Sequence, residues 1–293
     1  MSSRLSGLHL YPLKSAAAFS VPQAEVDAIG LVGDRRWMLV DPRGRPLTQR
    51  ELPRLARVHA IPAPAGGLEI VALGMPMLQL DVPGPAASVV HTELHGRPAE
   101  GWLAAPDAAD WLTDFLETPC RLLYVPPPLA RAVAAPWGLA HDRTAFTDGF
   151  PFLLIGEGSL AALNDRLGRP VPMDRFRPNL VVSGTEPFEE DEWQRLRIGS
   201  LECRVVKPCP RCVVTTVDQA TGALFRAGSV DDMVNVILDL LSNRASWPAV
   251  QARARNFVES ERTWPSVVAG YRSIYESIGS RTLSGTRQSG ERA

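Results

Sequence analysis

Two cysteines carry the strongest chemical signal in the sequence. Cys209 and Cys212 lie in a run that starts at Lys207 and contains Arg211 and two prolines. Proline fixes the backbone torsion φ, so this loop should hold both thiols in a set orientation. Basic neighbours favour the thiolate form of a cysteine, which is the form that binds a soft metal or attacks as a nucleophile. The run therefore predicts a metal ligand or a reactive thiol.

The spacing of this pair leaves other interpretations open. Structural zinc normally takes four ligands, and the sequence contains neither a second pair of cysteines at this spacing nor a paired histidine motif. A thioredoxin-like redox pair would open a helix, whereas the residues that follow Cys212 are β-branched and favour a strand. Zinc is disfavoured on this ground, while a redox pair or an inert buried pair stays an alternative.

The run around Cys212 resembles the signature of the MOSC domain family, which includes the mitochondrial amidoxime-reducing component and its bacterial relatives. In that family the second cysteine of the run is the protein ligand of molybdenum in the molybdenum cofactor (Mo-molybdopterin). The resemblance implies that Cys212 binds the metal and is the catalytic residue, and that Pro210 and Arg211 lie against the pterin. Cys209 matches the first cysteine of the run, which is not a ligand.

Three further segments resemble the same family, and each suits a pterin that carries a phosphate. In the first, Lys14 and Ser15 would offer an ammonium and a hydroxyl to phosphate oxygens. The second is an Asp-Arg pair whose Arg35 would add another cation. In the third, Arg177 and Asn179 resemble the family's pterin-contacting residues. Four segments in the right order are more specific than any one of them.

A looser resemblance covers the loop that contains Asp148 and Gly149, which would touch the cofactor through backbone or side chain. Taken singly, each basic residue also has an ordinary structural interpretation. Lys14 could solvate a loop, Arg35 could pair with a nearby aspartate, and Arg177 could anchor Asp174.

The resemblance implies an oxidoreductase that reduces N-oxygenated small molecules of the amidoxime or hydroxylamine type. No fourfold cysteine spacing of an iron–sulfur module follows the core, so electrons would come from a separate electron-donor protein. A second hypothesis belongs to a different class. The same residues would serve a carrier or binding protein for molybdenum cofactor or sulfur that turns over no substrate.

The composition argues against a nucleic-acid or membrane partner. The 293 residues include 31 Lys and Arg against 32 Asp and Glu, which gives a formal net charge of −1. Any anion site must therefore arise from local placement of basic groups. No apolar run approaches the ~20 residues of a membrane span, and the N-terminus lacks the apolar core of a secretory signal. We expect a cytoplasmic protein without a membrane span.

Apolar alternation broken by Gly and Pro predicts an all-β start to the chain. Residues 37–40 should pair with the residues from Leu47 onward as a hairpin around an Asp-Pro-Arg-Gly turn. Residues 108–116 have helical periodicity, with Asp107 as the expected N-cap. Residues 121–125 are strand-like.

Short apolar runs predict further strands on both sides of the cysteine pair. They cover residues 152–155, 180–183, 193–198, 202–206 and 213–217. The last of them would place Cys212 at the entrance of a strand. Ser159 should cap a helix that turns its leucines inward, and a turn should start at Asp218.

These elements predict an α+β protein that is mainly β. We expect an N-terminal β domain over residues 1–125 and a MOSC β-barrel over residues 126–227. The resemblance runs from about Leu8 to Thr221, after which the sequence departs from the family. Helical periodicity predicts an atypical helical tail over 228–280, with a disordered end over 281–293. Part of the tail resembles the end of a family 4 type glycosyltransferase.

Overall fold

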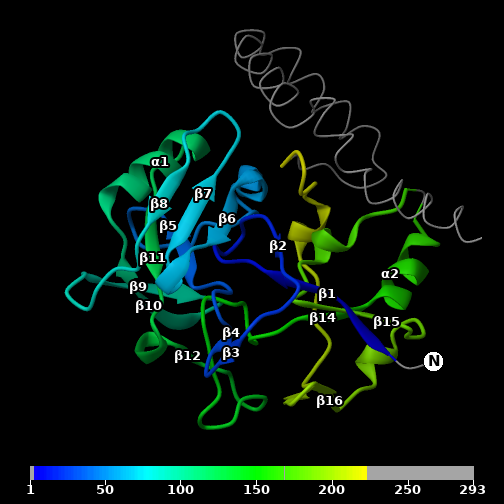
Figure 1. Ribbon diagram of the computed structural model, residues 1–293. Helices are drawn as coiled ribbons and strands as arrows, with labels where there is room; N and C mark the ends of the chain where they lie inside the picture. The colour runs from blue at the N-terminus through cyan, green and yellow to red at the C-terminus, as the bar shows by residue number, and fades with distance from the viewer. Residues whose placement is uncertain (1–2, 168, 223–293) are drawn as a thin grey trace, which may run out of the picture. The chain divides into compact units, whose positions relative to one another are not determined.

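Short strands dominate residues 3–167 and 169–222, which are the residues that the computed structural model describes (Figure 1). All of them lie in one compact unit of the chain. They include two α-helices, α1 (Pro106–Leu116) and α2 (Glu157–Asn164). The prediction of a mainly β fold is confirmed for this part of the chain.

An antiparallel four-stranded sheet organises the first half of the described chain. Its strands, in spatial order, are β5 (Trp37–Val40), β11 (Arg121–Tyr124), β10 (Arg97–Leu103) and β9 (Val89–Leu94). After β5 the Leu47 N–H donates to the Leu39 carbonyl at 2.9 Å, and Val40 forms an isolated bridge with Pro46. The predicted hairpin is confirmed, but its second arm pairs too briefly to form a named strand.

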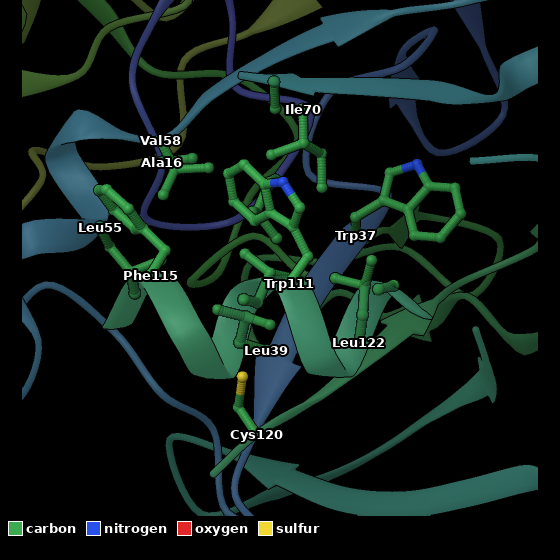
Figure 2. Packing of buried hydrophobic residues seen from close by; sticks show 14 of the residues in the cluster. Ala16, Trp37, Leu39, Leu55, Val58, Ile70, Trp111, Phe115, Cys120 and Leu122 are labelled. Carbon is green, nitrogen blue, oxygen red and sulfur yellow. The ribbon is translucent and has the colours of Figure 1, made fainter. Parts of the chain in front are cut away.

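Helix α1 packs between this sheet and a three-stranded sheet. The second sheet consists of β6 (His59–Pro62), β7 (Leu68–Val71) and β8 (Leu78–Leu80). Trp111, Leu112 and Phe115 are buried, as the periodicity predicts. Figure 2 shows Trp111 and Phe115 pointing from α1 into a cluster that also holds Leu55 and Ile70. Burying each such side chain contributes about 1.5–3 kcal/mol, which fixes α1 against both sheets.

The expected N-cap of α1 is wrong. The helix begins after Ala105, and Pro106 occupies its first turn. Proline suits that position because its missing N–H would have no partner there and its φ is already helical. Asp107 lies inside the first turn, where its carboxylate accepts a hydrogen bond from the Ala108 N–H.

A second four-stranded sheet joins the first strand of the chain to strands from its second half. Its strands, in spatial order, are β14 (Leu154–Gly156), β15 (Leu180–Ser183), β1 (Arg4–Leu10) and β2 (Phe19–Ser20). Strand β15 runs parallel to β14 and antiparallel to β1. Because β1 pairs with β15, the residues that follow β1 lie beside the residues that precede β15.

Three two-stranded pairings complete the described strands. They are β3 (Val26–Asp27) with β4 (Gly30–Leu31), β12 (Arg131–Ala132) with β13 (Arg143–Thr144), and β16 (Arg195–Ile198) with β17 (Leu201–Arg204). Between residues 3 and 222 no sheet closes into a barrel. The segments predicted as a helical tail and a disordered end lie outside the described residues.

Two local predictions in the second half are wrong. Residues Val213–Thr216 form a 3₁₀ helix instead of a strand, and Cys212 is its N-cap. The hydroxyls of Thr215 and Thr216 donate to the backbone carbonyls of Cys212 and Val213, respectively. These side chains therefore satisfy carbonyl groups that, in a strand, would accept from a neighbouring strand.

Ser159 does not cap α2, because the helix begins after Gly156 and Ser159 lies within its first turn. Its hydroxyl instead donates to the carboxylate of Glu190 at 2.7 Å. The leucines of α2 are half-buried rather than turned fully inward.

Candidate functional site

The segment after β1 connects the two four-stranded sheets. Leu13 forms a parallel bridge with Trp37 of β5, and the Lys14 N–H donates to the Trp37 carbonyl at 2.8 Å. This pairing buries the Lys14 side chain and directs its ammonium to an ion pair with Asp148. Lys14 therefore does not solvate a loop, and two predicted site residues 134 positions apart are in contact.

The Asp148 carboxylate lies close to several basic side chains. Its carboxylate accepts from Lys14 and lies 3.2 Å from Nε2 of His95, in the turn between β9 and β10. Burial lowers the pKa of Lys14, and the Asp148 charge opposes this effect. Burial would raise the pKa of Asp148, but the charge and hydrogen bond of Lys14 hold it well below its usual range. The Asp148 side chain is 60% exposed, so solvent screens these interactions.

Cys212 is a free, exposed thiol that reaches this group of charges through Arg50. Arg50 Nη2 lies 3.5 Å from Cys212 Sγ and 3.8 Å from an Asp148 carboxylate oxygen. The chain thus brings Cys212, Asp148 and Lys14 into one network. Sequence reasoning missed Arg50, since the only local signal is a short polar run after the apolar Leu47.

Polar contacts from two sides hold the cysteine loop, by which we mean residues 207–218. Arg175 donates to the Thr216 carbonyl and to the Asp218 carboxylate, both at 3.0 Å. Just beyond the loop, the Gln219 side-chain amide donates to that of Gln49 at 3.0 Å. The turn predicted at Asp218 is confirmed, because its carboxylate and carbonyl accept from the residues up to 222.

A second group of site residues surrounds one aromatic ring. We call Tyr11, Asp34, Arg35, Arg177 and Asn179 the Tyr11 cluster. Arg35 Nη1 donates to the Asp34 carboxylate at 2.6 Å and to the Asn179 side-chain oxygen at 2.8 Å. The pairing of Arg35 with a nearby aspartate is therefore real, and it coexists with the predicted gathering of these residues.

Arg177 supplies a donor with no partner in the described structure. Its Nη1 donates to the Ala16 carbonyl at 2.6 Å, whereas Nη2 is buried and makes no hydrogen bond within residues 3–167 and 169–222. Burial, followed by the like charge of Arg35, lowers the pKa of Arg177 to about 10. The guanidinium is thus still charged at neutral pH, and a buried charged donor without a partner is a place where an anion would bind.

Four of the seven described non-glycine residues with a left-handed φ lie in or beside these two groups. Ser15, Arg35, His95 and Arg177 have φ of 68°, 47°, 51° and 56°, in the left-handed region that residues with a side chain seldom adopt. Each such residue costs on the order of 1–3 kcal/mol and persists where surrounding contacts hold it. Three of the four are predicted cofactor contacts, and the fourth, His95, lies beside the predicted contact Asp148, which is the clustering expected of a functional site.

The remaining predicted residues lie around these two groups. Ser15 is tied to them through its carbonyl, which accepts from Gln49 at 2.8 Å. The Arg211 guanidinium lies 5.5 Å from the Phe176 ring centroid, next to Arg177. Gly149 follows Asp148 and faces open space, and Pro210 is exposed beside Arg211. Their contacts with a pterin stay predictions.

A hollow of about 400 Å³ lies elsewhere, between the ends of β1 and β16. Its lining includes Leu5, Leu154 and Trp193, and none of the predicted site residues takes part. The candidate site is therefore defined by its network of charges and not by this hollow.

Comparison with known proteins assigns the sequence to a family. The model of the MOSC N-terminal beta barrel domain matches residues 2–119, and that of the MOSC domain matches residues 141–283. The chain belongs to the MOSC domain family. The second match extends past residue 227, where we predict the domain to end, and the predicted boundaries stay predictions.

Relatives in this MOSC family cover most of the chain. Human mitochondrial amidoxime-reducing component 1 is 36% identical over 228 residues, which are 75% of this chain and 67% of the relative. The mouse protein of the same name is 34% identical over 84% of this chain and 72% of its own length. Rat mitochondrial amidoxime reducing component 2 is 37% identical over 76% of this chain and 69% of its own length. These similarities support a function associated with molybdenum cofactor.

The donor set of this MOSC chain fits such a cofactor. Cys212 offers an exposed sulfur, which is a soft ligand. Lys14, Arg35 and Arg177 offer cationic donors, one of which, Arg177 Nη2, has no partner of its own in the described structure. Among the described residues, no helix is long and apolar enough to cross a membrane.

Proposed function

We propose that this chain binds molybdenum cofactor through Cys212 and reduces N-oxygenated small molecules of the amidoxime or hydroxylamine type. One observation carries the proposal. The exposed thiol of Cys212 is linked through Arg50 and Asp148 to the buried ammonium of Lys14. Two residues after Lys14, the Ala16 carbonyl accepts a hydrogen bond from Arg177, which joins this network to the second group of basic residues. The names of the relatives, which are amidoxime-reducing components, support the same activity.

Each group of the site would have a separate task. The Cys212 thiolate would hold the metal, and Arg50 beside it would hold the sulfur in place through its contact at 3.5 Å. Lys14, Arg35 and Arg177 would receive the anionic group of the pterin, because charged donors bind phosphate oxygens strongly. Asn179, Pro210 and Arg211 are proposed contacts of the pterin itself, as are Ser15, Asp148 and Gly149.

When bound, the cofactor supplies a metal that exchanges electrons with a substrate. In the overall reaction an N–O bond breaks, two electrons and two protons enter, and the oxygen leaves as water. The electrons would come from a separate electron-donor protein. The chain's own part would be to bind and orient the cofactor, and the buried Lys14 and the backbone-strained Arg35 and Arg177 support this role.

Two finer predictions accompany this proposal. The barrel expected of the MOSC domain stays a prediction, because the family match continues to residue 283 and the described residues end at 222. A cytoplasmic location also stays a prediction, and the relatives' names place those proteins in mitochondria.

Molybdenum content tests the proposal most directly. The wild type and the variants Cys212→Ser and Cys209→Ser would be expressed in a host that makes the cofactor, and molybdenum per chain measured by elemental analysis. We expect near-stoichiometric metal in the wild type and in Cys209→Ser, and almost none in Cys212→Ser. Equal metal in Cys212→Ser, or none in a folded wild type, would refute the assignment.

Turnover then separates an enzyme from a carrier. Loaded wild-type protein would be given an amidoxime and an artificial electron donor, and the amidine formed would be measured. Product above the level of Cys212→Ser supports the reductase. Bound cofactor without product, across amidoxime and hydroxylamine substrates, supports the carrier instead.

A further inference from the structure

Tyr11 contacts both arginines of its cluster through its ring. The guanidinium carbon of Arg35 lies 4.4 Å from the ring centroid, and that of Arg177 lies 4.2 Å from it. Distances below about 6 Å permit a cation–π attraction, in which the negative face of the ring attracts the positive group. One ring therefore serves two cations that are 142 positions apart in the chain.

Tyr11 is anchored at its backbone and at the hydroxyl end of its ring. The Tyr11 N–H donates to the Asp34 carboxylate at 2.8 Å, and its hydroxyl donates to the Pro178 carbonyl at 3.1 Å. These two partners are the chain neighbours of Arg35 and Arg177. The side chain is 1% exposed, so the attraction acts in a desolvated place where it is strongest.

Both cations need such support. Arg35 and Arg177 repel each other, and each has a left-handed backbone that is unfavourable for a residue with a side chain. Asp34 neutralises Arg35, whereas the hydrogen-bond partners of Arg177 are neutral oxygens of Ala16 and Gln219. The ring face is thus the source of negative potential that lies against the Arg177 guanidinium, beside the more distant charges of Asp34 and Asp148, and it leaves Nη2 free to donate.

We propose that Tyr11 is a positioning residue, whose ring face holds Arg35 and Arg177 in the orientation that receives the anionic group of the bound cofactor. The inference rests on the proposed function for the identity of the ligand. Tyr11 does not touch the reacting atoms, and its effect passes through the two arginines. Burial raises the pKa of Tyr11 to about 12, so its phenol is neutral at physiological pH and acts through its ring and its hydrogen bonds.

The experiment varies the ring while keeping its shape. Position 11 would carry Tyr, Phe, or phenylalanine with three ring fluorines. The fluorines withdraw electron density from the ring face and nearly keep the size of the ring. Tyr11→Leu would remove the ring. The release rate of molybdenum from loaded protein would be measured beside the melting temperature. Phe115→Leu is the matched control, because Phe115 is also buried beneath an arginine, with Arg54 at 5.1 Å from its centroid.

The expected order of release follows the charge on the ring face. Tyr11→Phe should release the metal within about threefold of the wild-type rate, because the face is kept. The fluorinated ring and Tyr11→Leu should release it roughly tenfold faster or more, since two cation–π contacts are weakened. Phe115→Leu should melt at a lower temperature and keep the wild-type rate.

A probe without molybdenum makes the result independent of the loaded protein. Inorganic pyrophosphate should raise the melting temperature of metal-free wild type and Tyr11→Phe, and should raise it much less with the fluorinated ring. If folded fluorinated protein keeps both the wild-type release rate and the pyrophosphate effect, the role of Tyr11 is refuted. If wild type takes up no molybdenum yet pyrophosphate stabilisation depends on the ring, the proposed function fails and the role of Tyr11 stands.

Discussion

The Tyr11 cluster and the cysteine loop are built in different ways although they would hold two parts of one ligand. Tyr11 and Asn179 are each 1% exposed, and the cluster is held by charged hydrogen bonds among buried groups. The cysteine loop is exposed over residues 207–213, with Val213 at 48%, and is held near its end by the buried Val217 and by polar contacts from Arg175. The phosphate-binding half is therefore preformed by the core, while the sulfur-bearing half depends on a small number of tethers.

This difference suits the two tasks. An anion needs donors that are fixed before it arrives, since preorganised charges lose little on binding. A sulfur ligand must be reachable by solvent and by a large cofactor, so it cannot be sealed in apolar packing. If the comparison is correct, substitutions in the buried cluster should have larger effects than equivalent substitutions in the loop.

Apart from loss of the proposed metal ligand Cys212 itself, the largest effect is expected for Arg177→Met. It removes a cation whose Nη2 is buried, and removing one partner of a buried charged contact costs about 2–5 kcal/mol, which is roughly 30-fold or more in cofactor affinity. Arg211→Met is the matched change in the exposed loop and should weaken retention by about threefold or less. Molybdenum content after dialysis measures both. A larger loss for Arg211→Met would reverse the comparison.

An intermediate effect is expected for Arg50→Gln, which removes the contact with Cys212 and keeps a polar side chain. A hydrogen bond to a charged group contributes about 1.5–3 kcal/mol, and partial exposure reduces this, so we expect release to be roughly threefold to tenfold faster. Arg54→Gln is the control, because Arg54 pairs with Glu117 away from the loop. If Arg50→Gln and Arg50→Lys both release the metal at the same rate as the wild type and Arg54→Gln, the proposed role of Arg50 is refuted.

A smaller, local effect is expected for Asp218→Ala. Its carboxylate accepts from Arg175 and from the Thr221 N–H, so its loss should loosen the cysteine loop. Hydrogen exchange should quicken several-fold in residues 212–218 and stay unchanged in α1. Asp110→Ala, on the exposed face of α1, controls for loss of an acidic group. If residues 212–218 exchange hydrogen at the same rate in Asp218→Ala and Asp110→Ala, the hydrogen bonds of Asp218 contribute little to the order of the loop.

The smallest effect is expected for Asp148→Asn, at the junction of the two regions. The pKa of Asp148 is lowered in the folded protein, because Lys14 outweighs the opposing effect of burial. Its contribution to stability is therefore fully present above the ordinary value of 3.8 and declines as pH falls below it. The wild type should be more stable than Asp148→Asn at pH 6, because the variant leaves the buried Lys14 ammonium without its carboxylate. The 60% exposure of the Asp148 side chain should keep the difference to about 1 kcal/mol. Urea unfolding at pH 6 and at pH 3 should show that the difference in free energy of unfolding is smaller at pH 3. A larger difference at pH 3 would contradict a lowered pKa for Asp148.

The sequence by itself determined the residues with chemistry and the elements with strong local patterns. The buried face of α1, the Asp41 turn and the Asp218 turn follow from periodicity and turn chemistry, which act between near neighbours. The resemblance to MOSC proteins singled out Cys212, Lys14 and the two cluster arginines by residue type and order. A strand after Cys212 was wrong because the threonine hydroxyls satisfy nearby carbonyls, and β-propensity does not describe that competition.

Only the tertiary structure decided which of those residues meet and what holds them. Arg50 reaches a sulfur 162 positions away, and Tyr11 gathers two arginines from opposite halves of the described chain. Neither has a local signature, because both roles arise from β1 pairing with β15 and from the segment after β1 bridging to β5. Pairings between distant segments depend on the packing of the whole chain, so the positions of these side chains follow from the fold and not from the motifs that contain them.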